Sequence, residues 1–203
     1  MRKLWGRLTS VNVQKAAWAL DEAGLAYERV DAGGAHGVVD DPAYRAMNPN
    51  GLVPTLEEDG FILWESNAIL RYVAAISPAL ALPADPRTCA LVQQWLDWQA
   101  TTFTPAMRDA FWQLYRSPDP DRAVIAASVK RTEAFAAILD AHLADRDYAV
   151  GAGFSIADIA LGCAAHRWLN LPADRIERPA LRRWYERIAV RPGAARALGE
   201  PIS

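Results

Sequence analysis

Hydrophobic residues follow two different patterns in the two parts of the chain. Up to residue 76, strand-like runs alternate with runs at helical spacing, whereas the remainder is dominated by long helical patterns. Alternation and turn residues predict strands at 3–6, 26–30, 53–57 and 61–64. Helical spacing predicts helices from Val13 to a stop at Gly24, at 42–47, and through Ile69 to Val73. The order βαβ, short helix, ββα predicts a small mixed sheet with helices on its faces.

A proline-rich segment separates the two parts. Pro78, Pro83 and Pro86 fall within ten residues, and proline cannot continue a helix because it lacks the backbone N–H. We therefore predict a first domain at 1–76, a linker at 77–86 and a helical domain at 87–203. Within the last part, helices are expected at roughly 87–116, 121–144, 155–170 and 179–191.

Composition and charge narrow the class of protein. The 203 residues are 52% hydrophobic, which is enough for well-packed cores. The 22 Lys and Arg against 24 Asp and Glu leave a net charge of -2, so no basic field favours nucleic acid or anionic lipid. No stretch approaches the roughly 20 apolar residues of a membrane span, and the first residues lack the apolar region of a signal peptide. We expect a cytoplasmic protein with no nucleic-acid partner and no membrane partner.

The two cysteines do not indicate a redox or metal motif. Cys89 and Cys163 lie in helical patterns without CxxC spacing. This spacing argues against a disulfide framework and a zinc site, so we expect ordinary thiols and no metal.

A capping box is predicted at the start of the helix near residue 155. Ser155 and Asp158 stand at the N-cap and N3 positions, and Phe154 and Ile159 stand at the positions of a hydrophobic staple. The expected role of these residues is folding rather than chemistry.

Three segments together resemble the cytosolic glutathione transferases, in particular a bacterial branch of the Ser/Thr/Asn type. They are residues 48–56 (NPNGLVPTL), residues 64–69 (WESNAI) and the capping box. The resemblance covers essentially the whole chain. It implies an α/β plus all-α protein, in which a thioredoxin-like βαβαββα domain precedes an all-helical C-terminal domain. It also implies glutathione as cosubstrate, no metal and a homodimer.

The resemblance assigns glutathione binding to two motifs. It implies a cis bond before Pro54, which turns the backbone of Val53 toward the extended tripeptide, whereas the alternative is a trans proline at the start of an edge strand. Glu65 and Ser66 fall where a strand gives way to a helix. By resemblance, the helix N-terminus meets the γ-glutamyl carboxylate and Glu65 faces the ammonium, although Ser66 also suits a helix cap.

Other residues are weaker candidates for contact with glutathione. Asn50 is one, although its place in Asn-Pro-Asn-Gly also suits a turn. His36, Arg7 and Lys15 are cations near the same end of the predicted sheet, and any one of them is a candidate for the glycyl carboxylate.

A transferase must hold the glutathione thiol as an anion, because the free thiol has a pKa of about 8.5 and the thiolate is the nucleophile. Ser10-x-Asn12-x-x-Lys15 looks like the hydroxyl-x-Asn-x-x-Lys pattern of the bacterial branch. Ser10 is our first candidate for the donor to sulfur, Asn12 the second, and Thr9 a rival. Helix capping also explains Ser10 and Asn12, and the two roles are compatible because a hydroxyl both accepts and donates.

The electrophile site is expected between the domains, on the long helix near residue 110. Its candidate residues are Met107, Arg108, Phe111, Trp112 and Tyr115. Core packing explains the aromatic spacing at least as well, and Arg108 is the exception because a cation there suits an anionic substrate or the sulfur.

The sequence therefore predicts a glutathione transferase of detoxification, which activates glutathione as thiolate for attack on small, mostly apolar electrophiles. A glutathione-dependent disulfide or peroxide reductase is one alternative. A non-catalytic glutathione-binding or regulatory module is the other, because the same fold supports several functions.

Overall fold

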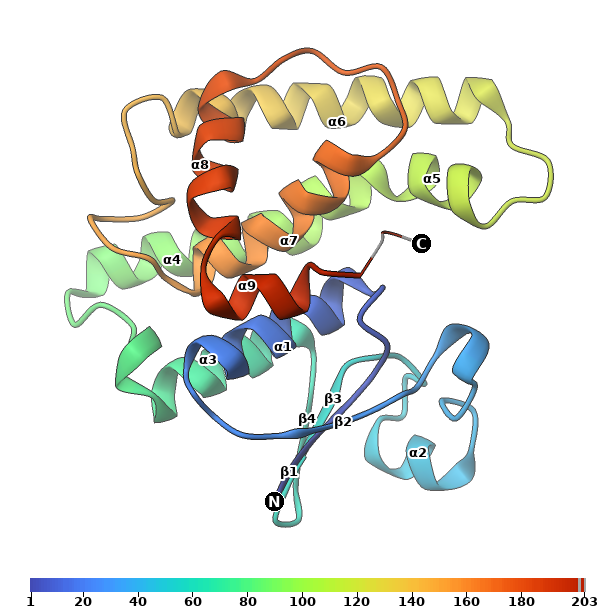
Figure 1. Cartoon of the computed structure of the whole chain (residues 1–203), viewed down its shortest axis with the longest axis vertical. Helices are drawn as coiled ribbons and strands as arrows, with labels where there is room; N and C mark the ends of the chain where they lie inside the picture. Colours follow the sequence, from blue (N-terminus) through green and yellow to red (C-terminus); the bar gives the residue numbers. More distant parts are fainter. Residues whose placement is uncertain (201, 203) are drawn as a thin grey trace. The chain divides into compact units, whose positions relative to one another are not determined.

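The computed structural model describes residues 1–200 and residue 202 (Figure 1). These residues form two compact units. The first unit contains Met1–Leu82 and the segment from Arg191 to residue 200, and the second contains Pro83–Val190 and residue 202. The segment from Arg191 to residue 200 therefore belongs to the first unit, although it follows the helical segment in the sequence.

A four-stranded mixed sheet forms the centre of the first unit. Its strands are β1 (Arg2–Trp5), β2 (Glu28–Val30), β3 (Thr55–Glu58) and β4 (Phe61–Trp64), in the order β2-β1-β3-β4. Strand β1 is parallel to β2, and the other two pairings are antiparallel. Leu4 and Leu56 are directly opposite one another and fully buried, which fixes the register. Asp59 and Gly60 form the predicted hairpin turn, both with positive φ.

Helices cover this sheet and contribute many of the buried side chains of the first unit. They are α1 (Val11–Glu22), η1 (Gly34–His36), α2 (Pro42–Met47), α3 (Ser66–Ile76), η2 (Pro78–Leu80) and α9 (Pro192–Ala197). In Figure 1, α1 and α3 lie against one another and α2 lies apart from them. Trp18 from α1 and Ile69 and Leu70 from α3 are fully buried. The single 3₁₀ turn of η1 falls where the glycine-rich sequence predicted only a loop.

Helix α9, which the sequence analysis missed, packs on α1. Arg191 forms an ion pair with Glu22, with Nε 2.9 Å from Oε1. A Cβ at Gly193 would lie 2.8 Å from Cδ1 of Trp18 and 3.0 Å from the backbone N of Glu22. Only glycine therefore allows α9 to approach α1 this closely.

All of the regular secondary structure described in the second unit is helical. Its elements are α4 (Pro86–Trp98), η3 (Gln99–Phe103), α5 (Thr104–Tyr115), α6 (Arg122–His142), α7 (Ile156–Asn170) and α8 (Pro179–Ala189). Phe103, Trp168 and Trp184 fill its core. None of the described helices in either unit is both long enough and apolar enough to cross a membrane.

The helix predicted at 87–116 is interrupted by a π-helical segment, η3, which ends two residues before Pro105. Proline supplies no N–H to the carbonyl four residues earlier, and its ring crowds that carbonyl. A local widening of the helix relieves this conflict, which explains why the helical pattern continues through two segments rather than one.

The predicted capping box is confirmed at the start of α7. The Asp158 carboxylate accepts hydrogen bonds from the backbone N of Ser155 at 2.9 Å and from its Oγ at 3.1 Å. It also accepts from the backbone N of Ala149 at 2.7 Å and from Nε1 of Trp184 at 2.9 Å. Burial raises the pKa of Asp158, and these donors act against that rise. The carboxylate thus ties α7 to the preceding loop and to α8.

Replacing Asp158 with alanine is expected to lower the free energy of unfolding by about 3 kcal/mol, because the buried N–H groups of Ala149 and Trp184 lose their acceptor. Chemical denaturation monitored by circular dichroism measures this change. The matched control is Asp145→Ala, which removes an exposed carboxylate and should change stability by less than about 0.5 kcal/mol. Equal stabilities for the two variants would contradict the assigned role.

Gly193→Ala is expected to destabilise the protein by about 1–3 kcal/mol, because the new methyl group collides with Trp18 and the backbone of α1. Gly153→Ala is the control, since a Cβ there has no neighbour within 4 Å. Thermal unfolding of both variants checks the result. A Gly193→Ala protein as stable as the Gly153→Ala protein would show that α9 does not need this close approach.

Candidate functional site

A small hollow in the first unit collects several of the predicted site residues. Its volume is about 50 Å³, and its lining residues are Asn12, Asn48, Asn50, Leu52, Val53, Pro54, Trp64, Glu65 and Ser66. They come from three places: the first turn of α1, the loop before β3 and the junction of β4 with α3. The structure thus brings Asn12, Asn50, Val53, Pro54, Glu65 and Ser66 together. Ser10, Thr9 and His36 are not among the residues that line it.

The loop before β3 presents its backbone to this hollow. The peptide bond between Val53 and Pro54 is cis, as the resemblance implied. Within residues 1–200 and 202, neither the N–H nor the C=O of Val53 has a hydrogen-bond partner in the protein. An extended peptide can therefore pair with Val53 as an added strand.

A buried polar cluster holds this loop in place. The Tyr44 hydroxyl donates to the C=O of Leu52 at 2.7 Å and lies 2.9 Å from Oγ1 of Thr55. Nδ2 of Asn48 donates to the same carbonyl at 2.9 Å and to Oγ1 of Thr55 at 3.1 Å. Burial raises the pKa of Tyr44, so the hydroxyl keeps its proton at neutral pH. Sequence reasoning missed this cluster, because its three members are ordinary residues for a helix, a turn and a strand.

Asn50 has the turn-making role that its sequence context predicted. Its backbone N lies 3.1 Å and its Nδ2 lies 3.2 Å from Oδ1 of Asn48, and both donate to that oxygen. The side chain also lines the hollow, so the turn places it beside the Val53 backbone.

At the junction of β4 with α3, the interpretation of Ser66 as a helix cap is wrong. Ser66 is the first residue of α3, and its hydroxyl donates to Oδ1 of Asn12 at 3.3 Å. Glu65 occupies the N-cap position with a positive φ of 71° and makes no capping hydrogen bond. Such a conformation is unusual for a residue other than glycine and is often found at functional sites. The start of α3, with the positive end of its dipole, is therefore not occupied by a capping side chain.

The loop before α1 carries the candidate sulfur donors. Ser10 occupies the N-cap position of α1, but its side chain makes no capping hydrogen bond, so the capping interpretation of Ser10 is not realised. Oδ1 of Asn12 accepts from Ser66, which leaves the Nδ2 amide as a donor toward the hollow. Thr9, the rival, is half-buried in the turn before Ser10.

The three candidate cations have different environments. Lys15 is 1% exposed, and its Nζ donates to Oδ1 of Asn67 at 2.9 Å, so its ammonium lies in the interior between α1 and α3. Arg7 packs against the backbone of residues 33–34, with Nη1 2.8 Å from where a Cβ of Gly33 would lie. His36 is half-exposed, with Nε2 3.9 Å from a carboxylate oxygen of Asp31.

The structure separates the five candidates for electrophile binding. Met107 and Phe111 are buried, and Tyr115 packs on Phe111 with ring centroids 5.2 Å apart. Arg108 and Trp112 instead line a second hollow, of about 300 Å³, together with Asp109, Gln113 and Val124. Arg167 was not among the predicted residues, although its guanidinium lies 4.0 Å from the centroid of the Phe111 ring.

The cysteines and the other titratable groups form no recognisable metal centre. In the part of the chain that the structure describes, no group of three or more His, Cys, Asp or Glu side chains is arranged to hold a metal ion. Cys89 is a half-buried free thiol, and Cys163 is a buried one.

Comparison with known proteins agrees with this geometry. The family model of the glutathione S-transferase N-terminal domain matches residues 2–75, and that of the C-terminal domain matches residues 122–187. Glutathione S-transferase GstB of Escherichia coli (strain K12) is 40% identical over 100% of both chains. Disulfide-bond oxidoreductase YfcG of Escherichia coli (strain K12) is 29% identical over 92% of this chain and 90% of its own.

A solved structure is also highly similar. It is the theta class glutathione S-transferase from Xanthomonas axonopodis pv. citri with glutathione bound, which is 44% identical, with a TM-score of 0.96 over 100% of this chain and 99% of its own. The chain therefore belongs to the glutathione S-transferase family. The predicted fold class and the assignment as a glutathione transferase are confirmed. The two alternative functions are not favoured, because the relatives at 40% and 44% identity are both glutathione S-transferases.

Proposed function

We propose that this glutathione transferase binds glutathione in the hollow beside Val53 and activates its thiol for attack on small, mostly apolar electrophiles. The observation that supports this most is the convergence of an unpaired backbone at Val53, an uncapped helix start at Ser66 and an amide donor at Asn12 in one hollow. The similar structure from Xanthomonas axonopodis pv. citri has glutathione bound, which supports the same ligand here.

Each chemical group of glutathione has a matching group in the hollow. The backbone of Val53 pairs with the cysteinyl residue of the tripeptide. The γ-glutamyl carboxylate meets the N-terminus of α3 at Ser66, where backbone N–H groups and the helix dipole favour an anion. The ammonium meets the exposed Glu65 carboxylate, and Asn50 completes the side wall. Arg7, which packs against residues 33–34, and His36 remain our proposed partners for the glycyl carboxylate.

The thiolate requires donors that are not already used by the protein. Lowering a thiol pKa by two units takes about 2.7 kcal/mol of preferential interaction with the anion. We assign this interaction with the thiolate to two donors. One is the Ser10 hydroxyl, which makes no capping hydrogen bond, and the other is the Nδ2 amide of Asn12, whose orientation is fixed by the hydrogen bond from Ser66. The N-terminus of α1 adds a favourable dipole at the same place. Thr9 takes no part in this assignment.

Recognition of the electrophile is assigned to α5. Arg108 and Trp112 line a hollow there and offer a cation beside an aromatic face. Met107 and Phe111 are buried and hold α5 in the core, while Tyr115 extends the aromatic surface next to Phe111. This combination suits a small apolar compound that carries or develops negative charge.

The test is a thiol titration of bound glutathione by its thiolate absorbance, and the wild-type complex is expected to titrate about two units below the free value of about 8.5. The thiolate then predominates at neutral pH. Ser10→Ala and Asn12→Ala are each expected to raise this pKa by about one unit, because each removes one donor to the anion. Thr9→Ala should leave it unchanged.

Glu65→Gln is the matched control for this titration. It should weaken glutathione binding by about tenfold through loss of the charged partner of the ammonium, without moving the thiol pKa. A wild-type complex with an unshifted thiol pKa would indicate a non-catalytic binding module. Turnover of a disulfide but not of an aryl halide would indicate a reductase.

We further propose that the protein is a cytoplasmic homodimer that serves detoxification. Leu91 on α4 and Ile138 on α6 are large apolar side chains that are 48% and 50% exposed. We assign both to contact with a second copy, which would remove their apolar surface from water.

Light scattering coupled to size exclusion is expected to give the mass of a dimer for the wild-type protein. Ile138→Glu should weaken the dimer by about tenfold or more, because it places a charge in an apolar interface. The control is Ile176→Glu, at another exposed isoleucine that lies outside α4, α5 and α6. A monomeric wild-type protein would refute the proposal.

A further inference from the structure

A charged hollow lies in the helical unit between the end of α7 and the start of α8. Its volume is about 250 Å³, and its lining consists of Trp168 and Leu169 on α7, residues 173–178 of the connecting segment and Arg182 in the first turn of α8. Five of these nine residues carry a full charge, and three of the five are arginines. Such a lining favours a hydrophilic anion over an apolar compound.

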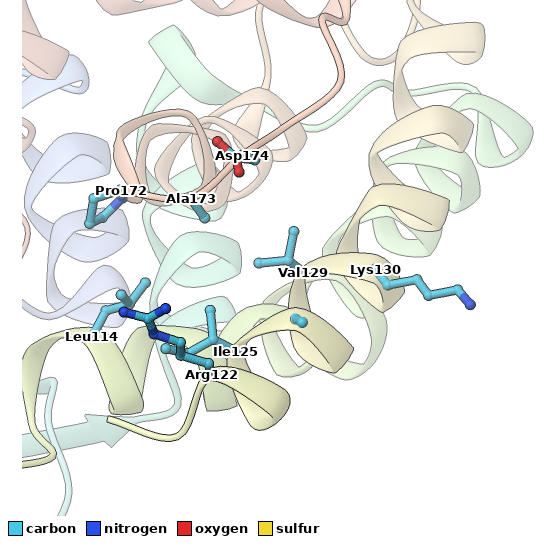
Figure 2. A pocket seen from close by; sticks show the side chains of 9 residues that line it. Leu114, Arg122, Ile125, Val129, Lys130, Pro172, Ala173 and Asp174 are labelled. Atoms are coloured by element: carbon cyan, nitrogen blue, oxygen red, sulfur yellow. The ribbon is translucent and has the colours of Figure 1, made fainter. Parts of the chain in front are cut away.

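The charged hollow differs in chemistry from a larger hollow beside it, which Figure 2 shows. The larger one has a volume of about 720 Å³ and apolar walls that include Ile125 and Val129 of α6. The two hollows share Ala173 and Asp174, which Figure 2 shows on the segment after α7. They share no cation, because Arg122 lines only the larger one. The two surfaces can therefore be tested separately.

Two of the three arginines in the charged hollow are held in place by the protein. Nη2 of Arg175 donates to the C=O of Leu169 at 2.8 Å, and its guanidinium carbon lies 5.7 Å from the centroid of the Trp168 ring. Nη2 of Arg178 lies 3.1 Å from Oε2 of Glu133 on α6, and the buried Nε of Arg178 has no hydrogen-bond partner among the described residues. Both guanidinium groups are thus positioned before a ligand arrives, which lowers the entropic cost of binding.

The third arginine, Arg182, is held much less firmly. Its Nε lies 3.5 Å from a carboxylate oxygen of Glu177, and within the described residues its guanidinium makes no other hydrogen bond or ion pair. The side chains of Arg182 and Glu177 are 46% and 79% exposed, so water weakens this pair. Glu177 is therefore a weak internal counterion, which an anion of higher charge can displace.

The arginines also repel one another. Burial lowers the pKa of Arg175, and the positive charge of Arg182 lowers it further, whereas Glu133 and Glu177 act in the opposite direction. The lowering by Arg182 means that the two guanidinium groups interact unfavourably while both are charged. An anion in the hollow offsets this repulsion, and a doubly charged anion does so more strongly than the single carboxylate of Glu177.

We propose that the charged hollow binds a phosphate dianion, either as inorganic phosphate or as the phosphate group of a small monoester. Arg182 donates to its oxygens in place of its contact with Glu177, while Arg175 and Arg178 supply fixed positive charge. The planar guanidinium matches a phosphate group, which carries about −1.5 to −2 charges at pH 7. The site goes beyond the proposed transferase function, because it uses none of the residues assigned to glutathione or to the electrophile.

The measurement is a phosphorus-31 NMR titration of inorganic phosphate with the full-length protein in Tris chloride buffer. Saturating glutathione is present throughout, so that phosphate does not occupy the glutathione site. Glycerol 3-phosphate is the monoester probe, and dimethyl phosphate is the singly charged control, which should bind at least about fivefold more weakly than phosphate. Binding of glycerol 3-phosphate as tight as that of phosphate supports a monoester, whereas binding of phosphate alone supports the free anion.

Two variants with opposite expected effects test the geometry. Arg182→Gln should weaken phosphate binding by about fivefold to tenfold, because it removes the guanidinium whose donors are least used by the protein. Glu177→Gln should strengthen binding by about threefold, because it removes the competing carboxylate. The matched controls are Arg122→Gln, which removes a cation from the neighbouring hollow, and Asp145→Asn, which removes an exposed acid. Each control should change binding by less than about twofold.

Four results would overturn the proposal, provided that circular dichroism shows each variant to be folded. The first is a wild-type protein that does not bind phosphate or the monoester, and the second is equal affinity for phosphate and dimethyl phosphate. The third is an equal loss of affinity in Arg182→Gln and Arg122→Gln, which would indicate attraction to overall charge. The fourth is a Glu177→Gln protein that binds phosphate no more tightly than the wild type. None of these readings depends on transferase turnover, so failure of this proposal is distinct from failure of the proposed function.

Discussion

The candidate site depends on one constraint. The backbone N–H and C=O of Val53 must stay free of hydrogen bonds within the protein, while the polar groups that support this loop are hydrogen-bonded to one another. An exposed loop with free N–H and C=O groups is ordinarily mobile, so a ligand that orders it loses affinity. Tyr44, Asn48 and Thr55 remove this cost by fixing the neighbouring carbonyl of Leu52 from inside the first unit. The protein therefore presents a preformed strand edge of one residue rather than a flexible turn.

A second set of contacts positions the groups around that edge. The Lys15 ammonium bonds Asn67 within the interior, and the Ser66 hydroxyl bonds Asn12, so α1 and α3 are joined twice close to their N-terminal ends. Both helices then direct the positive ends of their dipoles toward the same region. The donors left over, on Ser10 and Asn12, are neutral. A neutral donor stabilises a thiolate without forming a fixed ion pair, which leaves the sulfur free to react once an electrophile is present.

In the helical unit, a buried charge serves folding. Asp158 ties three segments together with four accepted hydrogen bonds, so the cost of burying its charge is offset by specific donors. An interior charge that is fully hydrogen-bonded in this way holds the fold together and is not available to a ligand.

The sequence by itself determined the order of elements, the hairpin at Asp59–Gly60, the capping box and the two motifs to which we assign glutathione binding. These features depend on local rules, namely periodicity, turn chemistry and residue types at fixed spacing. Only the tertiary structure decided that Ser66 bonds Asn12 instead of capping α3, that Lys15 is buried, and that α9 returns to α1. These contacts connect residues that are more than 50 positions apart in the sequence. Lys15 and Asn67, for example, are separated by 52 positions. Local patterns do not encode such contacts, because packing selects the partner of a polar side chain only after the chain has folded.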